Sequence, residues 1–216
     1  MANHVSNYIS VYGNDAALEA FMTICNRVPD TDPDAAQSYN IGDASYMRKD
    51  RLDMPDANEH NYNYEYYINE VGAKWADLNE YDEGYAMLTS AWGGLIPLAA
   101  YISEEIAEAD PNSYITLTCE DEMPNWFSVH AFHRGEQYDY AEWEWDDLVN
   151  SILDNYSDKI APKTQDIDDW TEEEIDFLAD VQYEEMQELQ DNALNGMRQA
   201  LEYDIEQMAN AHTVGC

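Results

Sequence analysis

The stretch Val5-Ser6-Asn7-Tyr8-Ile9-Ser10-Val11-Tyr12-Gly13-Asn14-Asp15 decides how the fold begins. Up to Tyr12 it is rich in β-branched and aromatic residues, which favour strands, and apolar and polar positions alternate weakly. Gly13 ends this run, and Asn14 or Asp15 is a suitable N-cap for a helix. Apolar residues then recur at helical spacing, at Ala17, Leu18, Phe21, Met22 and Cys25. The sequence therefore predicts a strand followed directly by a helix.

The next elements follow from turn residues and apolar spacing. In chain order they are a hairpin with arms 74–81 and 85–92 around Asp82-Glu83-Gly84, a helix over 95–109 and a strand over 114–119. The order strand, helix, hairpin, helix, strand is that of the split βαβ or ferredoxin-like arrangement. We therefore predict an α+β protein. Residues 1–120 form a ferredoxin-like domain with a four-stranded antiparallel sheet, helices near 15–26 and 95–109, and an irregular insertion at about 28–63.

The remaining chain divides into two further predicted parts. Residues 121–160 form an aromatic hairpin, with arms 126–134 and 137–140 across Gly135, and a short helix over about 142–156. Residues 161–216 form an acidic helical extension, which begins with the capping box Thr171-x-x-Glu174. Its helical pattern reaches Ala209, and Asn195-Gly196 is the one place where the sequence leaves open a break.

Three segments of the first part resemble the YubB-like ferredoxin-like family of phage and plasmid proteins. They are Asn3-x-x-Ser6-Asn7-Tyr8-Ile9-Ser10-Val11-Tyr12-Gly13, Gly72-Ala73-Lys74-Trp75-Ala76 and Thr89-Ser90-Ala91-Trp92. Where that family has Ser-Pro-Pro after the third segment, this chain has Gly93-Gly94 and a single Pro97. The resemblance covers about residues 3–120 and implies an origin in a mobile element. It implies no activity and assigns no functional residue.

Composition restricts the class of partner. The chain has 46 acidic and 9 basic residues among 216, a formal net charge of −37, yet 45% of its residues are hydrophobic. A chain this apolar folds, and its surface repels nucleic acid and anionic lipid. We therefore expect basic protein partners, with no direct nucleic acid and no membrane. The start Met1-Ala-Asn-His-Val lacks the features of a signal peptide, which predicts the host cytoplasm.

Catalytic and metal-binding motifs are not prominent, and we predict that the chain is not an enzyme and needs no cofactor. It contains neither GxSxG nor a glycine-rich phosphate loop. His130-x-x-His133 and Cys119 are three potential metal ligands. In a strand, however, positions i and i+3 point to opposite faces, which argues against a metal site.

Aromatic residues interleave with acidic ones in the predicted hairpin. Tyr138, Tyr140 and Trp143 are the candidates for partner contacts, since Tyr and Trp are favoured anchors in protein interfaces. The alternative is that these aromatic side chains form the buried face of a strand.

The strongest signal is the acidic extension. Glu172, Asp176, Asp180, Glu184 and Glu188 repeat at every fourth residue, and we call these five the acidic row. Like charges at this spacing weaken a helix, and solubility alone does not require them. The full set of predicted phosphate-mimicking residues is Asp146, Asp147, Asp168, Asp169, Glu172, Glu173, Asp176, Asp180, Glu184 and Glu188.

Together these features favour mimicry of DNA. We predict a phage- or plasmid-encoded inhibitor that occupies the nucleic-acid-binding cleft of a host defence or repair protein, such as a nuclease. One alternative is a structural or assembly protein that forms a homodimer or larger oligomer through its C-terminal helix. Another is a domain of unknown chemistry adapted to high salt, since the chain has only four lysines.

Overall fold

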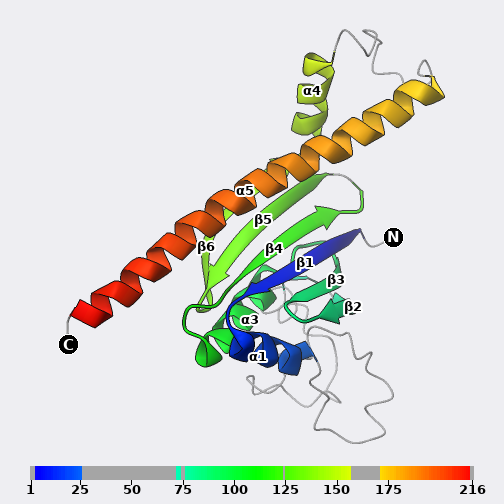
Figure 1. The fold of residues 1–216 in the computed structure, drawn as a ribbon. Coiled ribbons are helices and arrows are strands. Elements are labelled where there is room, and N and C mark those ends of the chain that lie inside the picture. Colours follow the sequence, from blue (N-terminus) through cyan, green and yellow to red (C-terminus); the bar gives the residue numbers. More distant parts are fainter. Residues whose placement is uncertain (1–2, 26–71, 74–75, 124, 157–170, 215–216) are drawn as a thin grey trace, which may run out of the picture.

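The computed structural model describes residues 3–25, 72–73, 76–123, 125–156 and 171–214 (Figure 1). In chain order the elements are β1 (His4–Tyr12), α1 (Asp15–Cys25), β2 (Ala76–Asp82), β3 (Tyr85–Ala91), α3 (Ile96–Ala109), β4 (Tyr114–Asp121), β5 (Trp126–His133), β6 (Glu136–Glu144), α4 (Trp145–Asn155) and α5 (Glu172–Val214). The strands form one antiparallel sheet in the order β2-β3-β1-β4-β5-β6. The predicted α+β class is confirmed, whereas the insertion at 28–63 lies outside the described residues.

The opening strand and helix form for the reasons that the sequence indicates. Along β1 every second residue is buried, so one face of the strand points into a core. The Asn14 side-chain oxygen accepts a hydrogen bond from the Ala16 amide at 2.9 Å, so Asn14 is the N-cap of α1. Gly13 is required by close packing, because a Cβ at this position would lie 2.8 Å from the Ala17 Cβ. The strand and the helix therefore meet in a tight corner.

The sheet has six strands: residues 1–120 contribute the four predicted strands, and the aromatic hairpin, which we predicted as a separate part, extends the same sheet. The aromatic hairpin is β5–β6, and it pairs with β4 through contacts such as Leu117 opposite His130. A four-stranded sheet would leave the backbone groups of β4 unpaired on that side, and pairing with β5 satisfies them. Strand β6 also continues to Glu144, so α4 begins at Trp145 rather than near residue 142.

The two faces of the sheet are covered by different helices (Figure 1). Helices α1 and α3 pack on one face, where buried residues such as Ile9, Phe21 and Ile102 form the largest core cluster. Helix α5 crosses the opposite face over β4, β5 and β6, and its Met197, Leu201 and Ile205 pack on Val129 and other residues of that layer. Helix α5 therefore covers the half of its face that β4, β5 and β6 form, together with the Tyr12 end of β1.

Helix α5 is one uninterrupted helix of 43 residues, about 65 Å long. It continues through Asn195-Gly196, where a Cβ on Gly196 would meet nothing within 4 Å. An exposed glycine inside a helix costs about 1 kcal/mol relative to alanine, which packing on the sheet offsets. Within the described ranges, no helix combines the length and the apolar character that a membrane span requires.

Candidate partner-binding surface

The five carboxylates of the acidic row are all exposed on α5. From Glu172 to Glu188 they extend over about 24 Å of helix and turn slowly around its axis, because four residues exceed one helical turn. Glu173 is exposed beside the row. Asp168 and Asp169, which we predicted to belong to the same surface, lie outside the described residues.

Asp146 and Asp147 are exposed in the first turn of α4, where negative charge interacts favourably with the helix dipole. Leu148 and Ile152 of α4 pack in one cluster with Val181 and Met186 of α5. The two helices that carry the predicted phosphate mimics are therefore held together by apolar contacts.

The acidic row has no neutralising partner in the described part of the chain. None of its carboxylates forms a hydrogen bond or an ion pair there. Arg198 is the only Lys or Arg of α5, and its guanidinium carbon lies 4.3 Å from the centre of the Tyr12 ring. Since Arg198 is directed onto the sheet, no described residue compensates the negative charge of the row.

The three predicted aromatic contacts are not on one surface. Trp143 is half-buried and stacks on Phe127, with ring centres 5.0 Å apart. Tyr140 is 60% exposed and stacks on His130. Tyr138 lies at a register shift in the β5–β6 pairing, and its hydroxyl donates a hydrogen bond of 2.7 Å to Asp204 of α5. Tyr138 is thus joined to the acidic helix by a hydrogen bond and Trp143 by apolar packing with the clusters that contain Met186 and Met197, while Tyr140 is exposed.

Tyrosine hydroxyls hold a second set of carboxylates on α5, which the sequence did not reveal. The Tyr114 hydroxyl donates to Glu202 at 2.5 Å, and the Tyr156 hydroxyl donates to Glu185 at 3.2 Å. Burial and the Glu202 contact raise the pKa of Tyr114 to about 12, so it remains a donor at neutral pH. The partners are 88 and 29 residues apart in the chain, which is why spacing gave no signal.

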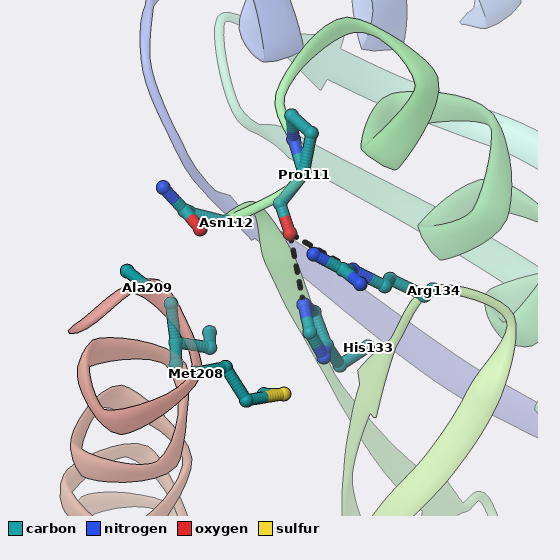
Figure 2. A pocket seen from close by; sticks show the side chains of 7 residues that line it. Pro111, Asn112, His133, Arg134, Met208 and Ala209 are labelled. Carbon is teal, nitrogen blue, oxygen red and sulfur yellow. Dashed lines mark hydrogen bonds between the residues drawn. The ribbon is translucent and has the colours of Figure 1, made fainter. Parts of the chain in front are cut away.

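A small hollow lies where the C-terminal part of α5 meets the β5–β6 turn (Figure 2). Its volume is about 200 Å³, below the range typical of small-molecule sites. His133 Nε2 and Arg134 Nε both lie 3.1 Å from the Pro111 carbonyl oxygen, which accepts their hydrogen bonds. The other histidine, His130, instead contacts the Ser128 hydroxyl at 2.8 Å. The hollow contains none of the predicted site residues.

A further surface lies on the part of the sheet that α5 leaves uncovered. The side chains of β1 and β3 that point away from α1 and α3 are partly exposed, and all except Met87 are polar or aromatic. We call this patch the tyrosine face; its residues are Ser6, Tyr8, Ser10, Tyr85, Met87 and Thr89. The alternation along β1 would have revealed it, had the extent of α5 on the sheet been known. Comparison of the chain with protein-family models, curated protein sequences and solved structures finds no match.

Proposed function

We propose that this chain is a phage- or plasmid-encoded DNA mimic. In the host cytoplasm it would occupy the nucleic-acid-binding cleft of a basic defence or repair protein. The observation that supports this most is the acidic row, whose exposed carboxylates have no partner in the described part of the chain. The row stands on an uninterrupted helix that is packed against a sheet.

The charge and its spacing are suited to such a cleft. Duplex DNA carries one charge per about 1.7 Å of helix axis, so a net charge of −37 equals that of about 63 Å of duplex. Helix α5, about 65 Å long, carries 12 of the 46 acidic residues and one arginine. A rigid array of carboxylates loses little conformational entropy on binding, and it competes for the Lys and Arg residues that hold phosphates.

The proposal extends to the fold and to the mode of action. The strand order β2-β3-β1-β4, with α1 and α3 in the connections, supports a ferredoxin-like unit like that of the YubB-like family. Inhibition by competition needs neither a catalytic residue nor a cofactor. We therefore retain the prediction that the chain is not an enzyme.

Capture from host lysate followed by displacement tests the proposal. Proteins captured on the immobilised chain at about 0.1 M salt should be released by duplex DNA. They should also be released by about 1 M salt, where the Debye length falls from about 10 Å to about 3 Å. The matched variant replaces the five row carboxylates by Gln, which keeps helix propensity nearly constant. Partners that DNA does not displace, or that the Gln variant retains equally, would contradict the proposal.

A second candidate, oligomerisation through α5, is favoured by large apolar or aromatic side chains exposed on that helix. They are Ile175, Tyr183, Tyr203 and Met208, between 43% and 62% exposed. Light scattering on the isolated protein separates the two functions. An oligomer has a mass above 24.8 kDa without any partner, whereas the mimic gains mass only when a basic protein is added.

A further inference from the structure

Arg198 shows how this protein binds an arginine between α5 and the sheet. Its guanidinium carbon lies 4.3 Å from the centre of the Tyr12 ring, and Tyr12 stacks on Tyr114 at 4.8 Å between ring centres. The Arg198 Nε also donates a hydrogen bond of 3.5 Å to the Tyr114 hydroxyl. Glu202, the carboxylate beside this arginine, accepts a hydrogen bond from that hydroxyl. The arrangement therefore consists of a tyrosine ring of β1, a carboxylate and an arginine.

The same strand places a second tyrosine next to a second carboxylate. Tyr8 lies four residues before Tyr12 on the same face of β1, about 13 Å away. Glu120 is on the adjacent strand, opposite Ser6, and accepts a hydrogen bond of 3.2 Å from Gln190 of α5. Burial, and next the charge of Glu120, raise the pKa of Tyr8, with a smaller contribution from Tyr183 of α5. Because Tyr8 pairs with Thr118 and Ser6 pairs with Glu120, Tyr8 and Glu120 are diagonal neighbours on one face of the sheet.

No arginine completes this second arrangement within the described residues. The Tyr8 ring has neither a stacking partner nor a cation above it there. Glu120 is partly buried and has no ion-pair partner among the residues that the structure describes, and burial raises the pKa of its carboxyl group. Helix α5 carries further exposed carboxylates, and Glu184, Glu188 and Asp191 share a helix side with Arg198 and Glu202 through steps of three and four residues.

We propose that Tyr8 and Glu120 form a binding site for an arginine side chain of the partner protein. The guanidinium would lie on the Tyr8 ring and donate hydrogen bonds to the Glu120 carboxylate. The tyrosine face would receive the segment that carries this arginine. The inference rests on the proposed function and specifies its partner: the docked segment is basic and contains arginine, not lysine alone.

The chemistry of the site selects for arginine. A guanidinium is planar, stacks on aromatic rings and donates several hydrogen bonds in a fixed geometry, whereas an ammonium is a strongly hydrated point charge. A partly buried carboxylate gains most from a donor that loses hydration readily. Residues on the tyrosine face itself, such as Met87 and Thr89, add uncharged contact area beside the arginine. Charge complementarity with α5 directs a basic segment to this place.

Binding of two labelled peptides, octa-arginine and octa-lysine, tests the inference by fluorescence anisotropy. The parent protein should bind the arginine peptide more tightly. Tyr8→Leu should weaken that binding about fivefold, which corresponds to a cation–π contact of about 1 kcal/mol. It should leave binding of the lysine peptide nearly unchanged. Glu120→Gln keeps the size of the side chain and should weaken both, the arginine peptide more.

Two controls separate the inference from the proposed function. Tyr203→Leu removes a tyrosine that is 61% exposed on α5 and should leave both affinities unchanged. Replacement of Glu172, Asp176 and Asp180 by Gln removes three of the five charges of the acidic row. This row variant should weaken binding of both peptides by the same factor. Equal affinities for the two peptides, or a Tyr8→Leu variant that behaves like Tyr203→Leu, would overturn the arginine site and leave the proposed function standing. If Tyr8→Leu loses the preference for the arginine peptide while the row variant binds both peptides as the parent does, the result would support the arginine site. It would also contradict a role of the acidic row in binding.

Discussion

Helices α3 and α5 bury the same number of side chains but differ threefold in length. Helix α3 buries six of its 14 residues, and five of them, including Leu98, Ile102 and Ile106, lie in the largest core cluster of the described residues. Among the side chains that the structure describes, α5 also buries six, although it has 43 residues. Helix α3 is therefore mainly a core element, while most of the described side chains of α5 are exposed.

The difference separates the helix that mainly forms the core from the helix on which we propose that a partner binds. The side chains of α5 that face the sheet, such as Met197 and Leu201, follow each other at steps of three and four residues. They hold the helix in one orientation, and the remaining positions carry exposed carboxylates and tyrosines. A helix longer than its packing requires is a rigid support for a charged surface. The predictions below test this division, from the largest expected effect to the smallest.

Truncation of a core residue should distinguish the two helices most clearly. Ile102→Ala on α3 removes a side chain that is 1% exposed and should lower the free energy of unfolding by about 2–5 kcal/mol. Met208→Ala on α5, where the side chain is 43% exposed, should change it by less than about 0.5 kcal/mol. Urea denaturation measures both. Equal losses would mean that the C-terminal part of α5 contributes to the core as α3 does.

Acid should destabilise the protein through His130, which lies on β5 and is buried. Burial lowers the pKa of His130 to about 4, against about 6.5 in an unfolded chain. Between these values the unfolded chain takes up a proton that the folded protein does not bind. Stability should therefore fall as pH decreases from about 6.5 to about 4, by on the order of 2–3 kcal/mol.

The matched control for this titration is His130→Gln, which keeps a polar group near Ser128 but does not titrate. Protonation of carboxylates changes the net charge of both proteins alike, so the quantity to measure is the difference in unfolding free energy between them. That difference should shrink as pH falls through the window. A constant difference would show that His130 is not buried as a neutral group.

Arg198 should contribute to the attachment of α5 on a smaller scale. Arg198→Met keeps an apolar side chain of similar length but removes the guanidinium from Tyr12 and Tyr114. The expected loss is about 1 kcal/mol of unfolding free energy. Gln199→Met, at the adjacent exposed position, is the control and should have almost no effect. Similar values for the two variants would mean that apolar contacts alone hold this part of α5.

Removal of charge from the acidic row should have the smallest effect on stability, and of opposite sign. With all five residues replaced by Gln, repulsion between adjacent turns disappears, and the protein should gain a few tenths to about 1 kcal/mol. Thermal melts in dilute buffer should show a cooperative transition for both proteins and a difference that salt reduces. Absence of a transition in the parent would favour the high-salt alternative. A loss of stability in the variant would mean that the row is structural.

Much of the fold could be predicted because its signals are local. Alternation along β1, the cap at Asn14 and the turn at Asp82-Glu83-Gly84 each act within a few residues, and the corresponding elements are present. The acidic row was visible for the same reason, since an exposed helix position depends little on distant residues. The length of the sheet was not visible, because the pairing of β5 with β4 depends on which edge is free after folding.

The features of the candidate site also divide into those that local sequence predicts and those that depend on tertiary structure. Local sequence was sufficient to identify which residues are charged, which segments are helical and that the row repeats every fourth residue, because helix geometry maps spacing onto position. Tertiary structure alone decided that Trp143 stacks on Phe127, that Tyr138 reaches Asp204 and that Tyr8 lies beside Glu120. It also decided which strands of that sheet face α5 covers. Such contacts join residues far apart in the chain, and they depend on how whole elements pack rather than on any pattern within one of them.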